Sequence, residues 1–377
     1  MRVGVPREVT PGEKRVPLVA DSVKRLASKK IDVSIESGAG TGSCITDEEF
    51  RAGGASVEPE SSALYASADV VLRLRVPNEE SIARLREGST LIAPLFPLQE
   101  QNAPLVRALA ARKVTTIAVD MIPRTTVAQM MDVLSSQATI AGYYAVLMAS
   151  AALPRFFPML MTAAGTIAPA RVLVLGAGVA GLQAIGTAKR LGAVVEAFDV
   201  RAVVKEQVES LGARFVQVES GEDAQAEGGY AKETSEEYKK KQAEAIARHV
   251  KTADVVIATA LIPGKRAPVL VTEEMVQSMK PGSVIVDLAA EQQGNCALTE
   301  PGQTVVRHGV SILGELDLPS RVAIHASQMY ARNMEKLLLH VCNKDGALHL
   351  DPENEITRGC LITVAGDVVH PKVKERL

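Results

Sequence analysis

The sequence predicts an α/β protein made of two doubly wound, Rossmann-like domains, each with a parallel sheet. Short apolar runs alternate with stretches of helical periodicity along most of the 377 residues, the pattern of a parallel sheet covered by helices. The chain is long enough for two such domains. A glycine-rich turn of the dinucleotide-binding kind begins the second series only, so we expect the first domain to lack a phosphate-binding fingerprint.

The first series of elements occupies about 120 residues. A second glycine turn, Gly38–Gly42, contains G-x-G but is not followed by a helix and acid at the spacing of a nucleotide site, so a structural turn is expected there. Asp47 is expected to cap a short helix. The predicted strands are Arg2–Pro6, Ile31–Ile35, Asp69–Leu74, Thr90–Leu95 and Thr115–Val119, and the predicted helices are Val16–Leu26, Glu79–Arg86 and Gln99–Arg112.

The longest apolar stretch runs from Thr139 to Ala168. Pro154 and Pro158 interrupt it and leave about 15 clean residues, short of the roughly 20 that a membrane-spanning helix needs. We therefore expect no membrane span, but a buried helix, Asp132–Leu153, followed by an irregular connection.

The second series begins near Ala168, and the last 50 residues are too few to fold alone. We expect this tail to pack with the first domain. The first domain is therefore predicted to comprise residues 1–135 and 327–377, and the second residues 136–326. The predicted strands of the second domain are Val172–Leu175, Val194–Phe198, Phe215–Val218, Asp254–Ala258, Ser283–Asp287, Thr304–Val306 and Ser311–Leu313. The tail is predicted to form a helix, Ala326–Val341, and two strands, Ala347–Leu350 and Cys360–Val364.

The stretch Arg171–Arg201 carries the most specific signal, because strand, glycines, helix, second strand and terminal acid follow in register. Glycines permit the tight turn, the approach of a pyrophosphate and close helix–strand packing, and the helix N-terminus favours phosphate. Asp199 can accept the ribose hydroxyls and would repel a 2′-phosphate, so NAD(H) is favoured; Arg201, a usual partner of 2′-phosphate, weakens that preference. The expected nucleotide contacts here are Gly176, Ala177, Gly178, Val179, Ala180, Gly181, Asp199, Val200 and Arg201.

Two polar segments allow two interpretations each. Met121–Gln137 is either a capped helix start with surface polar residues or a functional loop. Glu219–Lys241 is either a solvated loop leading into a charged helix or a mobile flap, with Gly228–Gly229 as hinge and Tyr230 as anchor.

Composition excludes several classes. A net charge of −2, aromatic residues at 3% and the absence of Trp argue against nucleic-acid binding. The four cysteines form no C-x-x-C pair, which argues against a metal site or a disulfide framework and favours a cytoplasmic protein. The N-terminus has the pattern of a strand rather than that of a signal peptide.

Taken together, the motifs resemble the soluble NAD(H)-binding alpha subunit (domain I) of proton-translocating NAD(P) transhydrogenases of the Re/Si-specific type. The matching pieces are MRVGVPREVTPGEKRVPL, PRTTVAQMMDVLSSQ, GAGVAGLQAIGTAKRLGA, VKEQVESLGA, GGYAKE, TALIPGKRAPVL and GSVIVDLAAEQQGNC. The resemblance implies two α/β domains with NAD(H) in the cleft between them and a homodimer. It also implies partner subunits that bind NADP(H), conduct protons and hold this chain at the cytoplasmic face of a membrane.

The resemblance also implies further site residues. A loop over the nicotinamide would contain Arg124, Gln129 and Asp132, with Ser135 nearby, and these four are expected at the reaction centre. A mobile loop would run from Gly228 to Glu233. The remaining expected nucleotide contacts are Thr125, Thr126, Val127, Ala128, Gly229, Tyr230, Ala260 and Leu261.

Alanine dehydrogenase is a related family and the main rival. Arg15 matches the arginine that this family presents to the substrate carboxylate. Its lysine and histidine, however, are replaced by Arg75 and Phe96, and the first histidine of the chain is His249. Amino-acid oxidation needs a group that titrates near neutral pH, whereas hydride exchange between two nicotinamides needs mainly positioning. The transhydrogenase interpretation is therefore preferred over an amino-acid dehydrogenase. A non-catalytic NAD-binding scaffold stays as a further alternative that the sequence does not exclude.

Overall fold

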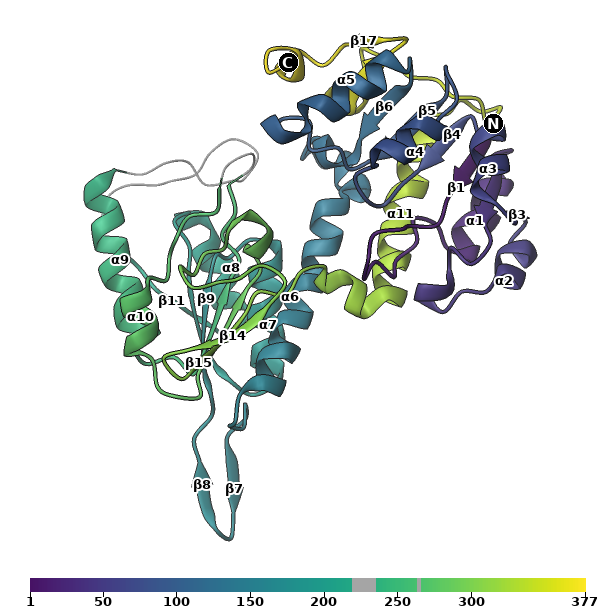
Figure 1. Ribbon diagram of the computed structural model, residues 1–377. Helices are drawn as coiled ribbons and strands as arrows, with labels where there is room; N and C mark the ends of the chain where they lie inside the picture. Colours follow the sequence, from purple (N-terminus) through teal and green to yellow (C-terminus); the bar gives the residue numbers. More distant parts are fainter. Residues whose placement is uncertain (219–234, 263–265) are drawn as a thin grey trace. The chain divides into compact units, whose positions relative to one another are not determined.

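The computed structural model describes residues 1–218, 235–262 and 266–377. The chain divides into two compact units, which are coloured along the sequence in Figure 1. The first unit comprises Met1–Gln137 and Pro319–Leu377, and the second comprises Ala138–Leu318. The first boundary thus lies two residues after the predicted one, at 137 instead of 135. The second lies eight residues before the predicted one, at 319 instead of 327.

The first unit is built on an eight-stranded sheet. Its order is β17-β16-β6-β5-β4-β1-β2-β3, in which β1 to β6 are parallel and follow the doubly wound order 3-2-1-4-5-6. The tail adds β16 antiparallel to β6, so the first unit is discontinuous in sequence. The strands are β1 (Arg2–Val5), β2 (Asp32–Glu36), β3 (Ser56–Glu58), β4 (Val70–Leu72), β5 (Thr90–Ala93), β6 (Thr115–Ala118), β16 (Leu361–Val364) and β17 (Asp367–Val368).

Helices cover both faces of this sheet because its strands are apolar on both sides. In β4, Val70 and Leu72 pack into one core with α1, α2 and α11, while Val71 packs into the other with α3, α4 and α5. The helices are α1 (Ala20–Ala27), α2 (Asp47–Ala52), α3 (Ser61–Ser67), α4 (Glu79–Arg84), α5 (Ala103–Ala111), α11 (Ala323–His340), α12 (Glu355–Cys360) and α13 (Pro371–Lys374). The 3-10 helices are η1 (Thr41–Ser43), η2 (Glu100–Asn102), η3 (Val119–Met121), η4 (Ala128–Met131) and η8 (Leu318–Val322).

Two sequence expectations for the first unit are wrong in detail. The N-cap of α2 is Thr46, which forms a capping box with Glu49, and Asp47 is the first helical residue. The Asp47 carboxylate instead accepts hydrogen bonds from Ser37 Oγ and Gly38 N, which stabilises the Gly38–Gly42 turn. The segment Ala347–Leu350 forms a single bridge, between Cys342 and Leu348, rather than a strand.

The second unit has a seven-stranded sheet of order β11-β10-β9-β12-β13-β15-β14. All pairs are parallel except β14 with β15, and the strand order reverses between β9 and β12. Ligands of doubly wound sheets bind at the carboxyl ends of the strands at such a switch point. The strands are β9 (Arg171–Leu175), β10 (Val194–Phe198), β11 (Arg214–Phe215), β12 (Val255–Ala258), β13 (Val284–Asp287), β14 (Thr304–Arg307) and β15 (Val310–Leu313).

Alternation along β9 places side chains in two cores. Val172 and Val174 pack with α6, α7 and α8, and Leu173 and Leu175 pack with α9 and α10. The helices are α6 (Val133–Ala152), which begins before the end of the first unit, α7 (Val179–Arg190), α8 (Lys205–Ser210), α9 (Glu236–Val250) and α10 (Glu273–Ser278), with η5 (Ala202–Val204) and η7 (Ala290–Gln292). These two cores and the sheet order confirm the predicted doubly wound α/β class.

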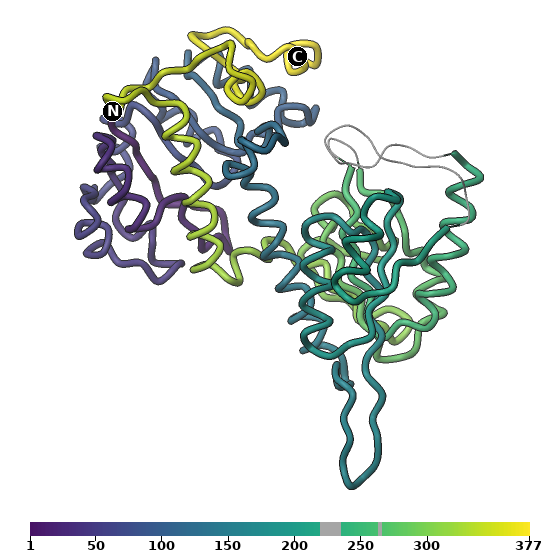
Figure 2. The backbone as a smooth tube through the Cα atoms, turned by 180° about the vertical axis from the view of Figure 1, so that it is seen from behind, coloured from purple at the N-terminus to yellow at the C-terminus, as the bar shows by residue number. Residues whose placement is uncertain are grey.

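A two-stranded hairpin follows α6, where the sequence predicted an irregular connection. Strands β7 (Leu160–Thr162) and β8 (Gly165–Ile167) pair antiparallel, and Gly165, with φ of +118°, completes the turn. Figures 1 and 2 show the hairpin projecting beyond the sheet of the second unit. The prediction missed these strands because each has only three residues, too few to show the alternation that indicates a strand. Within residues 1–218, 235–262 and 266–377, no helix is long and apolar enough to cross a membrane.

Candidate functional site

The glycine-rich turn lies between β9 and α7 at the switch point of the second sheet. Gly176 has φ of +99°, a left-handed conformation that a side chain would strain. Gly178 precedes α7 and has no side chain between solvent and the first N–H groups of that helix. A Cβ at Gly181 would lie 1.8 Å from the carbonyl oxygen of Gly176, so only glycine allows this approach. The turn therefore suits a pyrophosphate bound at a helix N-terminus.

The neighbouring strand β12 supports this turn through Thr259, whose Oγ1 donates to the carbonyl oxygen of Gly176 at 2.9 Å. Asn295 holds the next residue from both sides: its Oδ1 accepts from Ala260 N at 3.0 Å and its Nδ2 donates to Ala260 O at 2.9 Å. Ala260 is half-buried, with its backbone held by Asn295, and Leu261, the other contact expected here, is 41% exposed.

Asn295 is itself positioned by Asp287, the last residue of β13. The buried Asp287 carboxylate accepts from Ala289 N, Cys296 N and Thr299 Oγ1 at 2.7–3.0 Å and so closes the loop that contains Asn295. Thr259, Asp287 and Asn295 were not among the site residues predicted from the sequence. Thr259 directly follows β12 and Asp287 ends β13, and a polar residue at the end of a buried strand was the signal that could have found these two. Asn295 lies eight residues beyond β13, where no local signal marks it.

Asp199 follows β10 and is 9% exposed. Its Oδ2 accepts from Ala177 N at 2.7 Å, which links the carboxylate to the glycine turn. Arg201 donates to the same carboxylate through its backbone N, Nε and Nη2 at 2.8–2.9 Å. The hydrogen bond to Asp199 raises the pKa of Arg201. The acid expected to accept the ribose is therefore beside the turn, as predicted, but paired with Arg201.

The second group of expected residues lies in the first unit, around η4. Asp132 accepts from Ser135 N at 2.9 Å and from Ser135 Oγ at 2.6 Å, which is a helix cap at the start of α6. The backbone of the loop is held by Gln129 N donating to Thr125 O at 3.0 Å and by Asn333 Nδ2 donating to Met130 O at 2.8 Å.

Side chains of this loop divide by exposure. Ala128 is buried, whereas Arg124, Thr126, Val127 and Gln129 are exposed. The capped-helix interpretation is thus correct for Asp132 and Ser135, and the exposed side chains lie at the surface of the loop. Gly229 and Tyr230, together with the expected flap Gly228–Glu233, lie outside the described residues.

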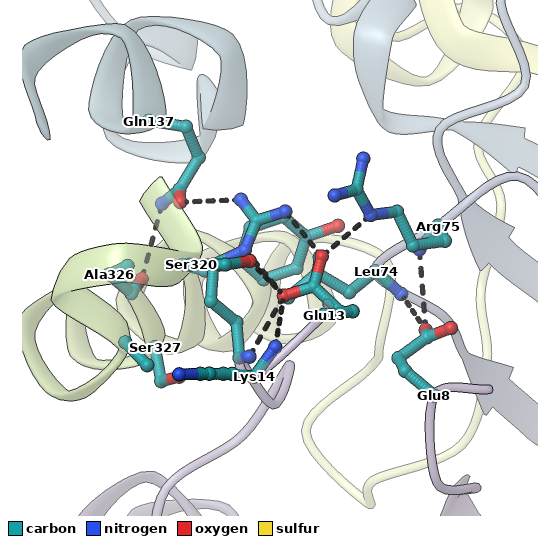
Figure 3. Close-up of polar contacts among 12 residues, drawn as sticks. Glu8, Glu13, Lys14, Leu74, Arg75, Gln137, Ser320, Ala326 and Ser327 are labelled. Atoms are coloured by element: carbon teal, nitrogen blue, oxygen red, sulfur yellow. Dashed lines mark hydrogen bonds and ion pairs between the residues drawn. The ribbon is translucent and has the colours of Figure 1, made fainter. Parts of the chain in front are cut away.

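A buried charged cluster in the first unit surrounds Glu13, whose side chain is fully buried (Figure 3). Arg15 donates to both carboxylate oxygens, through Nε at 2.8 Å and Nη2 at 2.6 Å, and Arg75 Nε donates to Oε2 at 2.6 Å. Ser320 Oγ donates to Oε1 at 2.7 Å. Burial alone raises the pKa of Glu13, but the hydrogen bond and charge of Arg15 and the charge of Arg75 outweigh it and hold the pKa at about 2.

Phe96 is the residue expected to replace the histidine of the rival family. Its φ is +45°, and its backbone N, like that of Leu95, donates to the Asp120 carboxylate, at 3.0 and 2.7 Å. Burial raises the pKa of Asp120. Among the described residues, no group of three or more His, Cys, Asp or Glu side chains could hold a metal ion.

Both parts of the chain match a known protein family. Residues 4–141 match the family described as alanine dehydrogenase/PNT, N-terminal domain, and residues 145–371 match alanine dehydrogenase/PNT, C-terminal domain. A Rhodospirillum rubrum protein described as the first part of NAD(P) transhydrogenase subunit alpha is 49% identical over 98% of both chains.

Solved structures point to the same two groups of proteins. The crystal structure of a transhydrogenase from Sinorhizobium meliloti is 46% identical, covers 98% of this chain and 100% of its own, and superposes with a TM-score of 0.89. An L-alanine dehydrogenase structure is 25% identical, covers 100% of this chain and 99% of its own, and has a TM-score of 0.82.

Proposed function

The chain belongs to the alanine dehydrogenase/PNT family, and we propose that it acts there as the NAD(H)-binding alpha subunit of a proton-translocating NAD(P) transhydrogenase. Its relatives at 40–49% identity are transhydrogenase alpha subunits, whereas the alanine dehydrogenases reach 25–33%. The proposal includes Re/Si-specific hydride transfer from NADH to NADP+ on a separate subunit. It also includes a homodimer at the cytoplasmic face of a membrane partner that conducts protons.

The observation that carries this proposal is the chemistry around Glu13. Arginine, the residue at position 75, is not a proton-transfer group in proteins, and the pKa of Glu13, at about 2, lies far below neutral. Phe96 has no ionisable group. The positions expected to transfer protons in an amino-acid dehydrogenase, those of Arg75 and Phe96, therefore hold no acid or base suited to neutral pH. Oxidation through an imine requires a group that titrates near neutral pH.

Direct hydride exchange has a different requirement, since no proton moves in the chemical step. Rate then depends on bringing the two nicotinamide rings to roughly 3–3.5 Å in an aligned pose. The glycine turn and Asp199 would hold the pyrophosphate and adenosine ribose of NADH. Gln129, Arg124, Asp132 and Ser135 would position the nicotinamide, with Gln129 orienting its carboxamide.

The decisive experiment mixes the chain with an NADP(H)-binding partner subunit and follows hydride exchange between NADH and an NADP+ analogue. Misplacing a reacting ring by about 1 Å can cost on the order of a hundredfold in rate. We expect Gln129→Asn to slow exchange by roughly ten- to a hundredfold and to change NADH affinity only a few-fold. Gln101→Asn, an exposed amide change in η2, is the matched control and should leave both unchanged.

Other outcomes identify the alternatives. Oxidation of NADH with pyruvate and ammonia would indicate an alanine-dehydrogenase-like enzyme. NADH binding with no hydride exchange in the presence of a competent partner would indicate a non-catalytic NAD-binding scaffold. A Gln129→Asn variant that exchanges hydride at the parent rate would show that the η4 loop is not at the reaction centre.

A further inference from the structure

The carboxylate of Asp199 already accepts four hydrogen bonds. Oδ1 accepts from Arg201 N and Arg201 Nε, both at 2.9 Å, and Oδ2 accepts from Ala177 N at 2.7 Å and Arg201 Nη2 at 2.8 Å. A carboxylate offers about four lone-pair positions. Ribose hydroxyls therefore cannot reach Asp199 unless one of these donors leaves.

The donors differ in their freedom to move. Ala177 N and Arg201 N belong to backbone that follows β9 and β10, whereas the Arg201 guanidinium is at the end of a flexible side chain. That side chain is 15% exposed, and its Nη2 lies 4.0 Å from the position of a Cβ at Gly178, beside the glycine turn. The guanidinium is thus the donor that a ribose hydroxyl can displace.

We propose that Arg201 is the specificity-determining residue of the nucleotide site, because its guanidinium covers the Asp199 carboxylate and must be displaced when NADH binds. This inference rests on the proposed function. Displacement weakens NADH binding, since an ion pair is lost when the ribose is bound. The displaced guanidinium remains near the ribose, where its planar fork can bind a 2′-phosphate in two places. Arg201 therefore makes the preference for NADH over NADPH smaller than Asp199 alone would produce.

The test measures dissociation constants of NADH and NADPH by calorimetry at fixed ionic strength for the parent chain, Arg201→Gln and Arg201→Lys. We expect Arg201→Gln to tighten NADH, to weaken NADPH and to raise the ratio of the two constants by roughly tenfold or more. That factor corresponds to the loss of one charge-assisted hydrogen bond. Arg201→Lys, which keeps the charge without the fork, should give an intermediate ratio.

Arg214→Gln is the matched control, because it removes the same charge from the adjacent strand β11. Its side chain is 79% exposed and lies 3.9 Å from Glu196, so the ratio should stay at the parent value. Equal weakening of NADH and NADPH by Arg201→Gln would show that Arg201 only braces Asp199, and would overturn the inference. If Arg201→Gln does not fold, Arg201→Lys provides the test. A ratio of the NADPH and NADH dissociation constants equal to that of the parent would then refute the inference. A parent chain that binds neither dinucleotide would instead refute the proposed function itself.

Discussion

Replacing Gly181 by alanine tests the close approach on which the candidate site depends. The added Cβ would lie 1.8 Å from the carbonyl oxygen of Gly176 and 2.9 Å from its carbonyl carbon, whereas real Cβ contacts are essentially never shorter than 3.0 Å. Either the first turn of α7 or the glycine turn must therefore move by at least about 1.2 Å. The obstacle is backbone rather than a flexible side chain, so the shift cannot be avoided by rotation.

The size of the effect follows from this shift. An N–H···O hydrogen bond of about 2.9 Å, lengthened by that amount, is no longer a hydrogen bond. Losing one charge-assisted bond to a phosphate costs about 1.5–3 kcal/mol, which weakens NADH binding by roughly ten- to a hundredfold or more. Overpacking should also destabilise the second unit by about 1–3 kcal/mol.

Gly186→Ala is the control, because it places the same methyl group in the same helix. Its Cβ would meet Arg190 Nη1 at 3.7 Å and Leu211 Cδ2 at 4.0 Å, which are ordinary contacts. Alanine in a helix interior should stabilise the protein by about 0.5–1 kcal/mol with NADH affinity unchanged. Calorimetry gives the affinities and denaturant unfolding gives the stabilities. A folded Gly181→Ala variant that binds NADH within threefold of the parent would refute the reasoning.

Two more predictions concern buried polar groups. The pKa of Glu13 is about 2 in the folded protein, below its ordinary value of 4.5. The ionised carboxylate therefore adds about 3 kcal/mol to the free energy of unfolding above pH 4.5, and this contribution is lost as the pH falls towards 2. Glu13→Gln should therefore destabilise the protein strongly at pH 7 and progressively less below pH 4.5 in urea unfolding; a pH-independent difference would contradict this. Asn295→Asp places a carboxylate against two carbonyl oxygens, those of Ala260 and Pro268, and should weaken NADH about tenfold. Asp254 directly precedes β12, at the amino ends of the strands and away from the glycine turn, so Asp254→Asn should lower stability without changing NADH affinity. An equal loss of affinity in both variants would count against a positioning role for Asn295.

Local patterns were sufficient for much of this molecule. The alternation of apolar runs and helical periodicity identified both doubly wound sheets, because buried parallel strands must be continuously apolar. The sequence from Val172 to Asp199 likewise predicted a nucleotide site, since strand, turn, helix and acid are neighbours along the chain. Local signals failed where strands are too short to show a periodic pattern, as in the β7–β8 hairpin.

Only the tertiary structure decided which distant residues meet. Thr259 supports the glycine turn from 83 residues away along the chain, and Gly142 lies so close to α7 that a Cβ there would be 2.0 Å from Ala180 O. The pairing of Asp199 with Arg201 is local, yet its geometry depends on the position of Ala177 N in the folded turn. Such contacts depend on how strands order themselves in a sheet and how helices pack upon it. Periodicity along the chain specifies the faces that must be buried, but not the partners that each face receives.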